Sequence, residues 1–180
     1  MTEGIISLKF LLSLLRTLTF QGLPMISIDI PGRDALKLVS AVFDYNGTLA
    51  ADGKLTAETG NALSTLKNSL DIHILTADTF GSVEKEMDIP GITVSIIGAD
   101  SQAEQKRDYI RSLGAYTAAA AGNGANDALM LGEAALGICV AGKEGACSET
   151  LAASEITVCS PDDALGLLLN PDRIRATLRR

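Results

Sequence analysis

Polar residues that could handle a phosphoryl group recur along this chain at the ends of short apolar stretches. Asp44 ends the apolar run SAVF, and Thr76 follows DIHIL. Lys106 lies early in the polar segment SQAEQKRDYIRSLG, while Asn123 and Asp127 lie in the loop GNGAND. Phosphoryl transfer depends mainly on positioning and charge neutralisation. A carboxylate nucleophile, a hydroxyl and an ammonium for the phosphate oxygens, and a second carboxylate for a cation would together supply it.

The elements that must position these residues alternate between short apolar strands and helices. This alternation predicts parallel βαβ units with right-handed crossovers, in a doubly wound, Rossmann-like α/β fold of three layers. The expected strands are 25–30, 37–45, 71–77, 92–97, 115–121, 136–140 and 155–160. The expected helices are 56–70, 80–87, 101–114, 126–134, 143–154, 162–170 and 171–180. The first strand, the turn PGR and the second strand predict a leading β-hairpin that feeds the central strand.

Each candidate residue also has a simpler explanation when it is taken alone. Asn46-Gly47 is a strong turn dipeptide, and Thr76 could be an ordinary hydroxyl at a strand end. Lys106 could be one solvated lysine of EQKRD, and GNGAND could be a glycine-rich loop that caps the next helix. However, all of them fall in order near the ends of their elements. In an open parallel sheet the carboxyl ends of the strands line one crevice, which favours a shared site.

The four motifs DYNGTL, LTAD, Lys106 and GNGAND resemble those of the haloacid dehalogenase (HAD) superfamily. Within it they look most like the phosphorylation domain of P-type ATPases and its small soluble relatives. The TAD of residues 76–78 resembles the ATPases' T-G-D, and GNGANDALML resembles their G-D-G-x-N-D. The resemblance covers about residues 25–170. It implies an aspartyl-phosphate intermediate and a Mg²⁺ cofactor.

The resemblance also implies a role for each matching residue. It makes Asp44 the nucleophile and gives Thr76 and Lys106 catalytic contacts with the phosphoryl group. The residues that it implies for phosphate binding are Asn46, Gly47, Thr76, Ala77 and Lys106. The residues that it implies for the metal are Asp44, Asn46 through its backbone carbonyl, Asn123 and Asp127.

Two positions depart from the pattern of the superfamily. Phosphatases of the superfamily carry an acid two residues after the nucleophile, where this chain has Asn46. General acid–base catalysis is worth about a hundred- to ten-thousandfold, so hydrolysis of the phosphoenzyme should be slow. Asn123 replaces a metal-binding aspartate, so Mg²⁺ affinity should fall. The intervals between the motifs are also too short for a cap domain, which leaves the site open to water, a partner or a large substrate.

Two functional readings remain open. The first is a Mg²⁺-dependent phosphohydrolase or phosphotransferase that acts on a phosphorylated small molecule or a phosphoprotein. The second is a regulatory module that binds phosphate or becomes phosphorylated at Asp44 with little or no turnover. A third reading takes GNGAND as a dinucleotide loop, but it lacks the third glycine and lies late in the chain.

Composition limits the other possibilities. The 180 residues fit one domain, 25–180, and a net charge of −7 argues against a nucleic-acid partner. Residues 1–24 are expected to be either a non-native extension or an amphipathic helix, since their apolar run is too short and too charged for a membrane span. Three cysteines without CxxC spacing indicate buried thiols in a reducing cytoplasm, and His73 is expected to be a strand residue. An open site and an exposed hairpin favour a homo-oligomer.

Overall fold

The computed structural model describes residues 24–77, 83 and 87–180 of the chain. Its central sheet consists of β3 (Ser40–Asp44), β4 (Asp71–Thr76), β5 (Ile92–Ile96), β6 (Ala118–Gly122), β7 (Leu136–Val140) and β8 (Ile156–Val158). All six strands are parallel, in the order β5-β4-β3-β6-β7-β8. The chain leaves β3 toward one edge and later returns to β6 to build toward the other. The order therefore reverses between β3 and β6, the place where open α/β sheets bind ligands.

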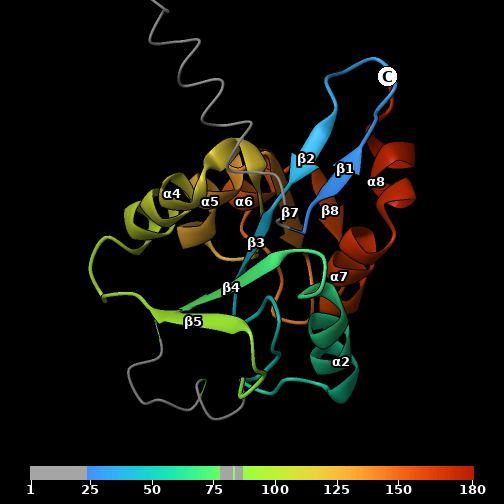
Figure 1. Cartoon of the computed structure of the whole chain (residues 1–180). Helices are drawn as coiled ribbons and strands as arrows, with labels where there is room; N and C mark the ends of the chain where they lie inside the picture. Colours follow the sequence, from blue (N-terminus) through green and yellow to red (C-terminus); the bar gives the residue numbers. More distant parts are fainter. Residues whose placement is uncertain (1–23, 78–82, 84–86) are drawn as a thin grey trace, which may run out of the picture.

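Helices cover both faces of this sheet, as predicted (Figure 1). They are α2 (Ala57–Leu66), α4 (Gln102–Leu113), α5 (Ala128–Glu133), α6 (Ser148–Ala153), α7 (Pro161–Leu169) and α8 (Pro171–Leu178). Helices α4, α5 and α6 gather on one face, and α2 and α7 lie on the other. The three-layer, doubly wound fold expected from the sequence is confirmed.

The core is divided by the sheet into two apolar clusters. Successive side chains of β3 point to opposite faces, so Phe43 joins the cluster beneath α2 and α7 while Val42 joins the one beneath α4 and α5. Every residue of β3, β6 and β7 is buried, as expected for strands that are covered on both faces. Asp44 is thus the charged end of a strand that is buried along its whole length.

A short antiparallel hairpin precedes the sheet, which confirms the predicted leading hairpin. It pairs β1 (Ile26–Ile28) with β2 (Leu36–Leu38) and packs against α8. The single strand predicted over 37–45 is wrong in one respect, because β2 and β3 belong to different sheets. Val39 separates them, since its amide donates to Thr117 O at 2.8 Å and its carbonyl accepts from the Asp71 amide at 2.9 Å.

Two predicted elements begin too early. Residues 115–117 form a 3₁₀ turn, η1 (Ala115–Thr117), and the strand begins only at Ala118. The helix predicted over 143–154 begins at Ser148, because Gly142 and Gly145 are bridged and Gly145 has a φ of +79°. Residues 141–147 instead form a loop, called here the clamp loop. The predicted helix 80–87 lies mostly outside the described residues, as do residues 1–23.

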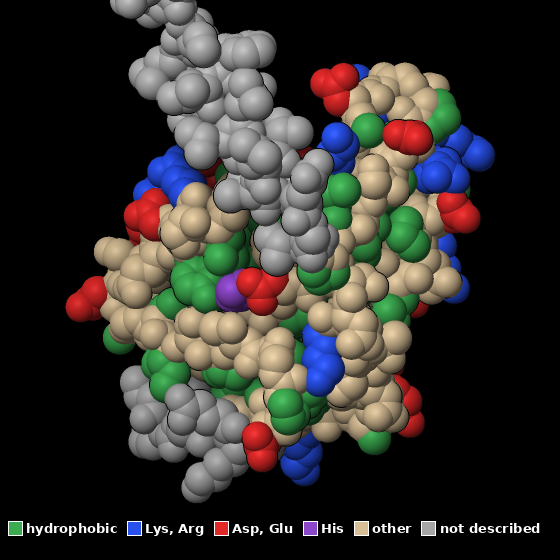
Figure 2. Space-filling view, viewed as in Figure 1, with side chains coloured by type: hydrophobic (Ala, Val, Ile, Leu, Met, Phe, Trp, Pro, Cys, Tyr) green, Lys and Arg blue, Asp and Glu red, His purple; other side chains and the backbone are tan. Residues whose placement is uncertain are grey.

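The links that follow β3 and β4 are short. Residues 45–56 join β3 to α2, and residues 77–91 join β4 to β5, which leaves no length for another domain. Figure 2 shows acidic and basic side chains interspersed on one face of the molecule. Among the described helices, none combines the length and the apolar character that a membrane crossing requires.

Candidate active site

Asp44 is presented by a tight loop that follows β3, residues 45–50, called here the site loop. The Tyr45 carbonyl accepts from the amides of Leu49 and Ala50, both at 2.9 Å, and the Gly47 amide donates to Ala50 O at 2.8 Å. Gly47 has a φ of +77°, a conformation that favours glycine. The Asn46 side chain is exposed, whereas Gly47 and Thr48 are buried. The loop thus turns sharply at the point where the nucleophile is expected.

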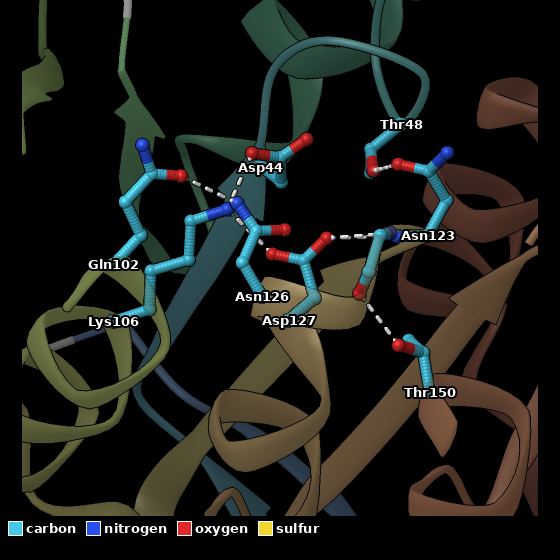
Figure 3. Close-up of polar contacts among 9 residues, drawn as sticks. Asp44, Thr48, Gln102, Lys106, Asn123, Asn126, Asp127 and Thr150 are labelled. Carbon is cyan, nitrogen blue, oxygen red and sulfur yellow. Dashed lines mark hydrogen bonds and ion pairs between the residues drawn. The ribbon is translucent and has the colours of Figure 1, made fainter. Parts of the chain in front are cut away.

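A buried ion triad joins three of the predicted site residues (Figure 3). Lys106 Nζ lies 2.7 Å from Asp44 Oδ1 and 2.6 Å from Asp127 Oδ1. The Lys106 and Asp127 side chains are each 1% exposed, and that of Asp44 is 12% exposed. The three residues come from α4, β3 and the turn η2 (Ala125–Asp127). The sheet and one helix therefore bring together residues that the sequence separates widely.

Asp127 is held from both sides. Its Oδ2 accepts from the backbone amides of Asn123 and Gly124, each at 3.0 Å. A Cβ atom at Gly122 would lie 2.5 Å from Asp127 Cβ, so only glycine leaves room for this carboxylate. Asp127 is completely buried and both of its oxygens are engaged. It is therefore fixed in position and serves Lys106 as a counter-charge.

The buried contact changes the pKa values of Asp44 and Lys106. Burial raises the pKa of Asp44 from 3.8 to about 7, and Asp127 adds to this, while Lys106 and Thr48 act in the opposite direction. Burial alone would lower the pKa of Lys106, but Asp44 and Asp127 outweigh it and raise that pKa above 10.5. Lys106 is thus a permanent cation, while Asp44 can exist with or without its proton near neutrality.

Thr76 and Ala77 lie at the same edge of the sheet. Asp44 pairs with Leu75 across β3 and β4, so buried Thr76 lies one residue beyond Asp44 on the adjacent strand. Ala77 is exposed, and Asp78 of the TAD motif is outside the described residues. The carboxyl ends of β3, β4 and β6 thus bring Asp44, Thr76 and the GNGAND loop to one edge of the sheet, where Lys106 reaches them from α4.

Several polar residues near the triad were not predicted from the sequence. Asn126 Nδ2 donates to Gln102 Oε1 at 2.8 Å, which joins the first turn of α4 to η2. Thr150, fully buried on α6, donates to Gly124 O at 2.6 Å and supports the GNGAND loop from below (Figure 3). No sequence signal marks these residues, because their partners are distant along the chain.

The histidine and the cysteines are not members of the triad. His73 is a buried residue of β4, as expected, and its Nδ1 lies 2.9 Å from the Tyr109 hydroxyl. Of the three free cysteines only Cys139 is buried, and Cys159 is exposed, so the expectation of buried thiols is wrong for the latter. Within the described part of the chain, no group of three His, Cys, Asp or Glu residues is arranged to hold a metal ion.

Comparison with solved structures identifies the fold. The chain is similar to the 3-deoxy-D-manno-octulosonate 8-phosphate phosphatase of Moraxella catarrhalis, solved with magnesium, phosphate and KDO, at 23% identity and a TM-score of 0.59, covering 79% of this chain and 94% of that one. It is also similar to the cobalt-bound phosphatase of this kind from Haemophilus influenzae, at 12% identity and a TM-score of 0.60, with coverage of 79% and 94%. A Legionella pneumophila protein described as a hydrolase of HAD superfamily subfamily III A has 17% identity and a TM-score of 0.62, with coverage of 78% and 86%.

Sequence comparison alone adds less. No protein-family model matches the chain. An uncharacterized protein of Methanocaldococcus jannaschii is 57% identical over 60 residues, which are 33% of this chain and 64% of that protein. The match therefore spans less than two thirds of the relative and leaves most of this chain unmatched. The structural likeness carries the assignment: the chain has the fold of the HAD-type phosphatases.

Proposed function

We propose that this chain is a Mg²⁺-dependent phosphohydrolase or phosphotransferase that acts through an aspartyl phosphate on Asp44. The observation that carries the proposal is the contact of Asp44 with the buried ammonium of Lys106, at the carboxyl end of β3. This is the point of the sheet where ligands bind in open α/β folds. Two similar structures, a magnesium complex and a cobalt-bound form of the same kind of phosphatase, support the cofactor.

In this proposal the chain's own residues neutralise and orient the phosphoryl group. Asp44 attacks phosphorus as a carboxylate, the bond between phosphorus and the ester oxygen of the substrate breaks, and the leaving oxygen takes a proton from water. Lys106 offsets the negative charge that gathers on the attacking and phosphoryl oxygens. The hydroxyl of Thr76 and the backbone of Asn46, Gly47 and Ala77 would hydrogen-bond those oxygens. Asp127 keeps Lys106 in position from its opposite side.

The residues near Asp44 offer oxygen ligands that suit a hard cation such as Mg²⁺, but they offer few of them. Asp44 and the backbone carbonyl of Asn46 would hold the ion, with Asp127 and Asn123 beside them. Mg²⁺ usually keeps several waters and binds through one or two carboxylates together with substrate phosphates. When bound, it would supply Lewis-acid neutralisation of the transferring group.

Asn46 sets the expected rate. An amide cannot accept or deliver a proton at neutral pH, so no side chain at this position would activate the water that releases phosphate. We expect a phosphoenzyme that forms and then loses its phosphate about 10² to 10⁴ times more slowly than it would with an aspartate at this position. A protein that is phosphorylated without turnover, which would fit a regulatory module, is the alternative. The likeness to P-type ATPases stays a prediction.

Phosphate release from an aryl phosphate with Mg²⁺ tests the proposal in three proteins: the wild type, Asp44→Asn and Asn46→Asp. We expect slow release by the wild type, none by Asp44→Asn, and faster release by Asn46→Asp. An unchanged rate in Asp44→Asn would show that Asp44 is not the nucleophile. An acyl phosphate that is trapped on Asp44 without any release would favour the regulatory alternative.

A further inference from the structure

Asn123 connects three parts of the site. Its backbone amide donates to Asp127 Oδ2 at 3.0 Å, and its carbonyl accepts from the Cys147 amide at 2.8 Å. Its side chain Oδ1 accepts from Thr48 Oγ1 at 3.1 Å, and its Nδ2 donates to Gly145 O at 3.2 Å. The side chain therefore bridges the site loop, through Thr48, and the clamp loop, through Gly145 (Figure 3 shows Thr48 and Asn123).

The two loops are also close elsewhere. A Cβ atom at Gly47 would lie 2.5 Å from Asn123 Nδ2, so the site loop rests directly against the amide. Farther along the same link, the Asp52 amide donates to Glu144 Oε1 at 2.9 Å, with Asp52 at a φ of +52°. The clamp loop is thus joined to the segment after β3 at two separate points.

The chemistry at position 123 requires an amide. The bond to Gly145 needs a donor on the side chain, and a carboxylate would place an unpaired negative charge against that carbonyl. The same amide uses its oxygen to accept from Thr48, and Asp127 uses both oxygens for Lys106 and backbone amides. The Asp44 carboxylate, which contacts Lys106 and Thr48, has the most exposed side chain of the triad, so it is the charge that an incoming cation reaches first.

We propose that Asn123 is a positioning residue that ties the site loop to the clamp loop by hydrogen bonds, so that Mg²⁺ binds firmly only together with a phosphate group. The inference rests on the proposed function for the identity of the ligands. A cation that reaches Asp44 and one backbone carbonyl has too few anionic donors by itself. Phosphate oxygens would complete the coordination of the cation. Their negative charge would also reduce the repulsion between the cation and the Lys106 ammonium.

Calorimetry of MgCl₂ binding, with and without inorganic phosphate, tests this on wild type and Asn123→Asp. We expect weak binding of Mg²⁺ alone to the wild type and a gain of about 5- to 150-fold with phosphate, the usual range of coupling between two sites. In Asn123→Asp the new carboxylate should strengthen binding of Mg²⁺ alone by about 10- to 100-fold. Asn61→Asp, which adds the same charge at an exposed position of α2, should leave it unchanged.

Hydrogen exchange of the clamp-loop amides measures the tie itself. Without cation, exchange in residues 141–147 should be faster in Asn123→Asp than in the wild type, and Mg²⁺ should restore protection in the variant. Thr48→Val breaks one bond of the bridge and should speed exchange without raising Mg²⁺ affinity. Equal Mg²⁺ affinity in wild type and Asn123→Asp, or exchange that neither variant alters, would overturn the proposal. These readouts do not need turnover, so they still decide it if phosphate release proves absent.

Discussion

Replacing Lys106 by methionine isolates the energetics of the triad. Methionine keeps an unbranched apolar chain of similar length and removes the ammonium that lies between Asp44 and Asp127. The two carboxylates would then face each other in a buried site without a cation. Removing one partner of a buried ion pair costs about 3–5 kcal/mol of folding free energy. We expect Lys106→Met to lose a comparable amount at neutral pH, together with all activity.

The size of this loss should depend on pH, and its sign follows from Asp44. The pKa of this group is already raised from 3.8 to about 7 with Lys106 present, and without the ammonium it rises further. A raised carboxyl pKa means that the folded state holds a proton that the unfolded state has released. The stabilisation that this proton provides is complete below pH 3.8, and it declines as the pH rises toward the pKa of Asp44 in the folded state. Above pH 7 the wild-type slope levels off, whereas the variant continues to lose about 1.4 kcal/mol per pH unit.

Urea unfolding of both proteins at about pH 6 and about pH 8.5 measures this difference. The gap in the free energy of unfolding between wild type and Lys106→Met should widen at the higher pH. Adding Asp44→Asn to Lys106→Met removes the carboxyl that titrates, so the widening should disappear in the double variant. A difference in unfolding free energy that stays constant with pH, or that is under about 1 kcal/mol throughout, would refute the claim that the buried triad causes the loss of stability.

Other predictions concern the loops and the reaction. Thr150→Val leaves the Gly124 carbonyl without its buried donor and should cost about 1–3 kcal/mol in urea unfolding, whereas Thr150→Ser should cost much less. Gly47→Ala places a side chain at a φ of +77° and against Asn123, so a loss on the order of 1–3 kcal/mol is expected by the same measurement; a neutral result would contradict the loop geometry. Because Mg²⁺ would bind the ionised form of Asp44, whose pKa without metal is raised to about 7, Mg²⁺ affinity should fall about tenfold per pH unit below about 7, and a flat profile would argue against the raised pKa.

The sequence predicts the fold well where local pattern and burial agree. The apolar run 136–140 is strand β7 without any shift of its ends, and Thr56 caps α2 through a hydrogen bond to the Thr59 amide. The pattern misleads where glycine competes with helix formers. Lys143 and Glu144 favour a helix by propensity, but Gly142 and Gly145 close a tight loop before α6 can begin.

The candidate site is predictable in its members but less so in its contacts. The order of the motifs and the parallel sheet indicate that Asp44, Lys106 and Asp127 converge, because carboxyl ends of parallel strands share one edge. The partners of Asn123 could not be found in the same way. Thr48 lies 75 residues away and Gly145 lies 22 residues away, so no local periodicity relates them.

The two asparagines that depart from the superfamily pattern differ in what holds them. Asn46 has an exposed side chain on the site loop, so an aspartate there would gain a proton carrier at little cost in stability. Asn123 is built into the loop contacts, so an aspartate there would break a hydrogen bond unless a cation replaced it. Asn46→Asp should therefore raise phosphate release with an unfolding midpoint close to that of the wild type, and Asn123→Asp should lower the midpoint in the absence of Mg²⁺. If both substitutions shifted the unfolding midpoint by the same amount, Asn46 and Asn123 would contribute alike to stability. The claim that Asn123 has a structural role and Asn46 has none would then be wrong.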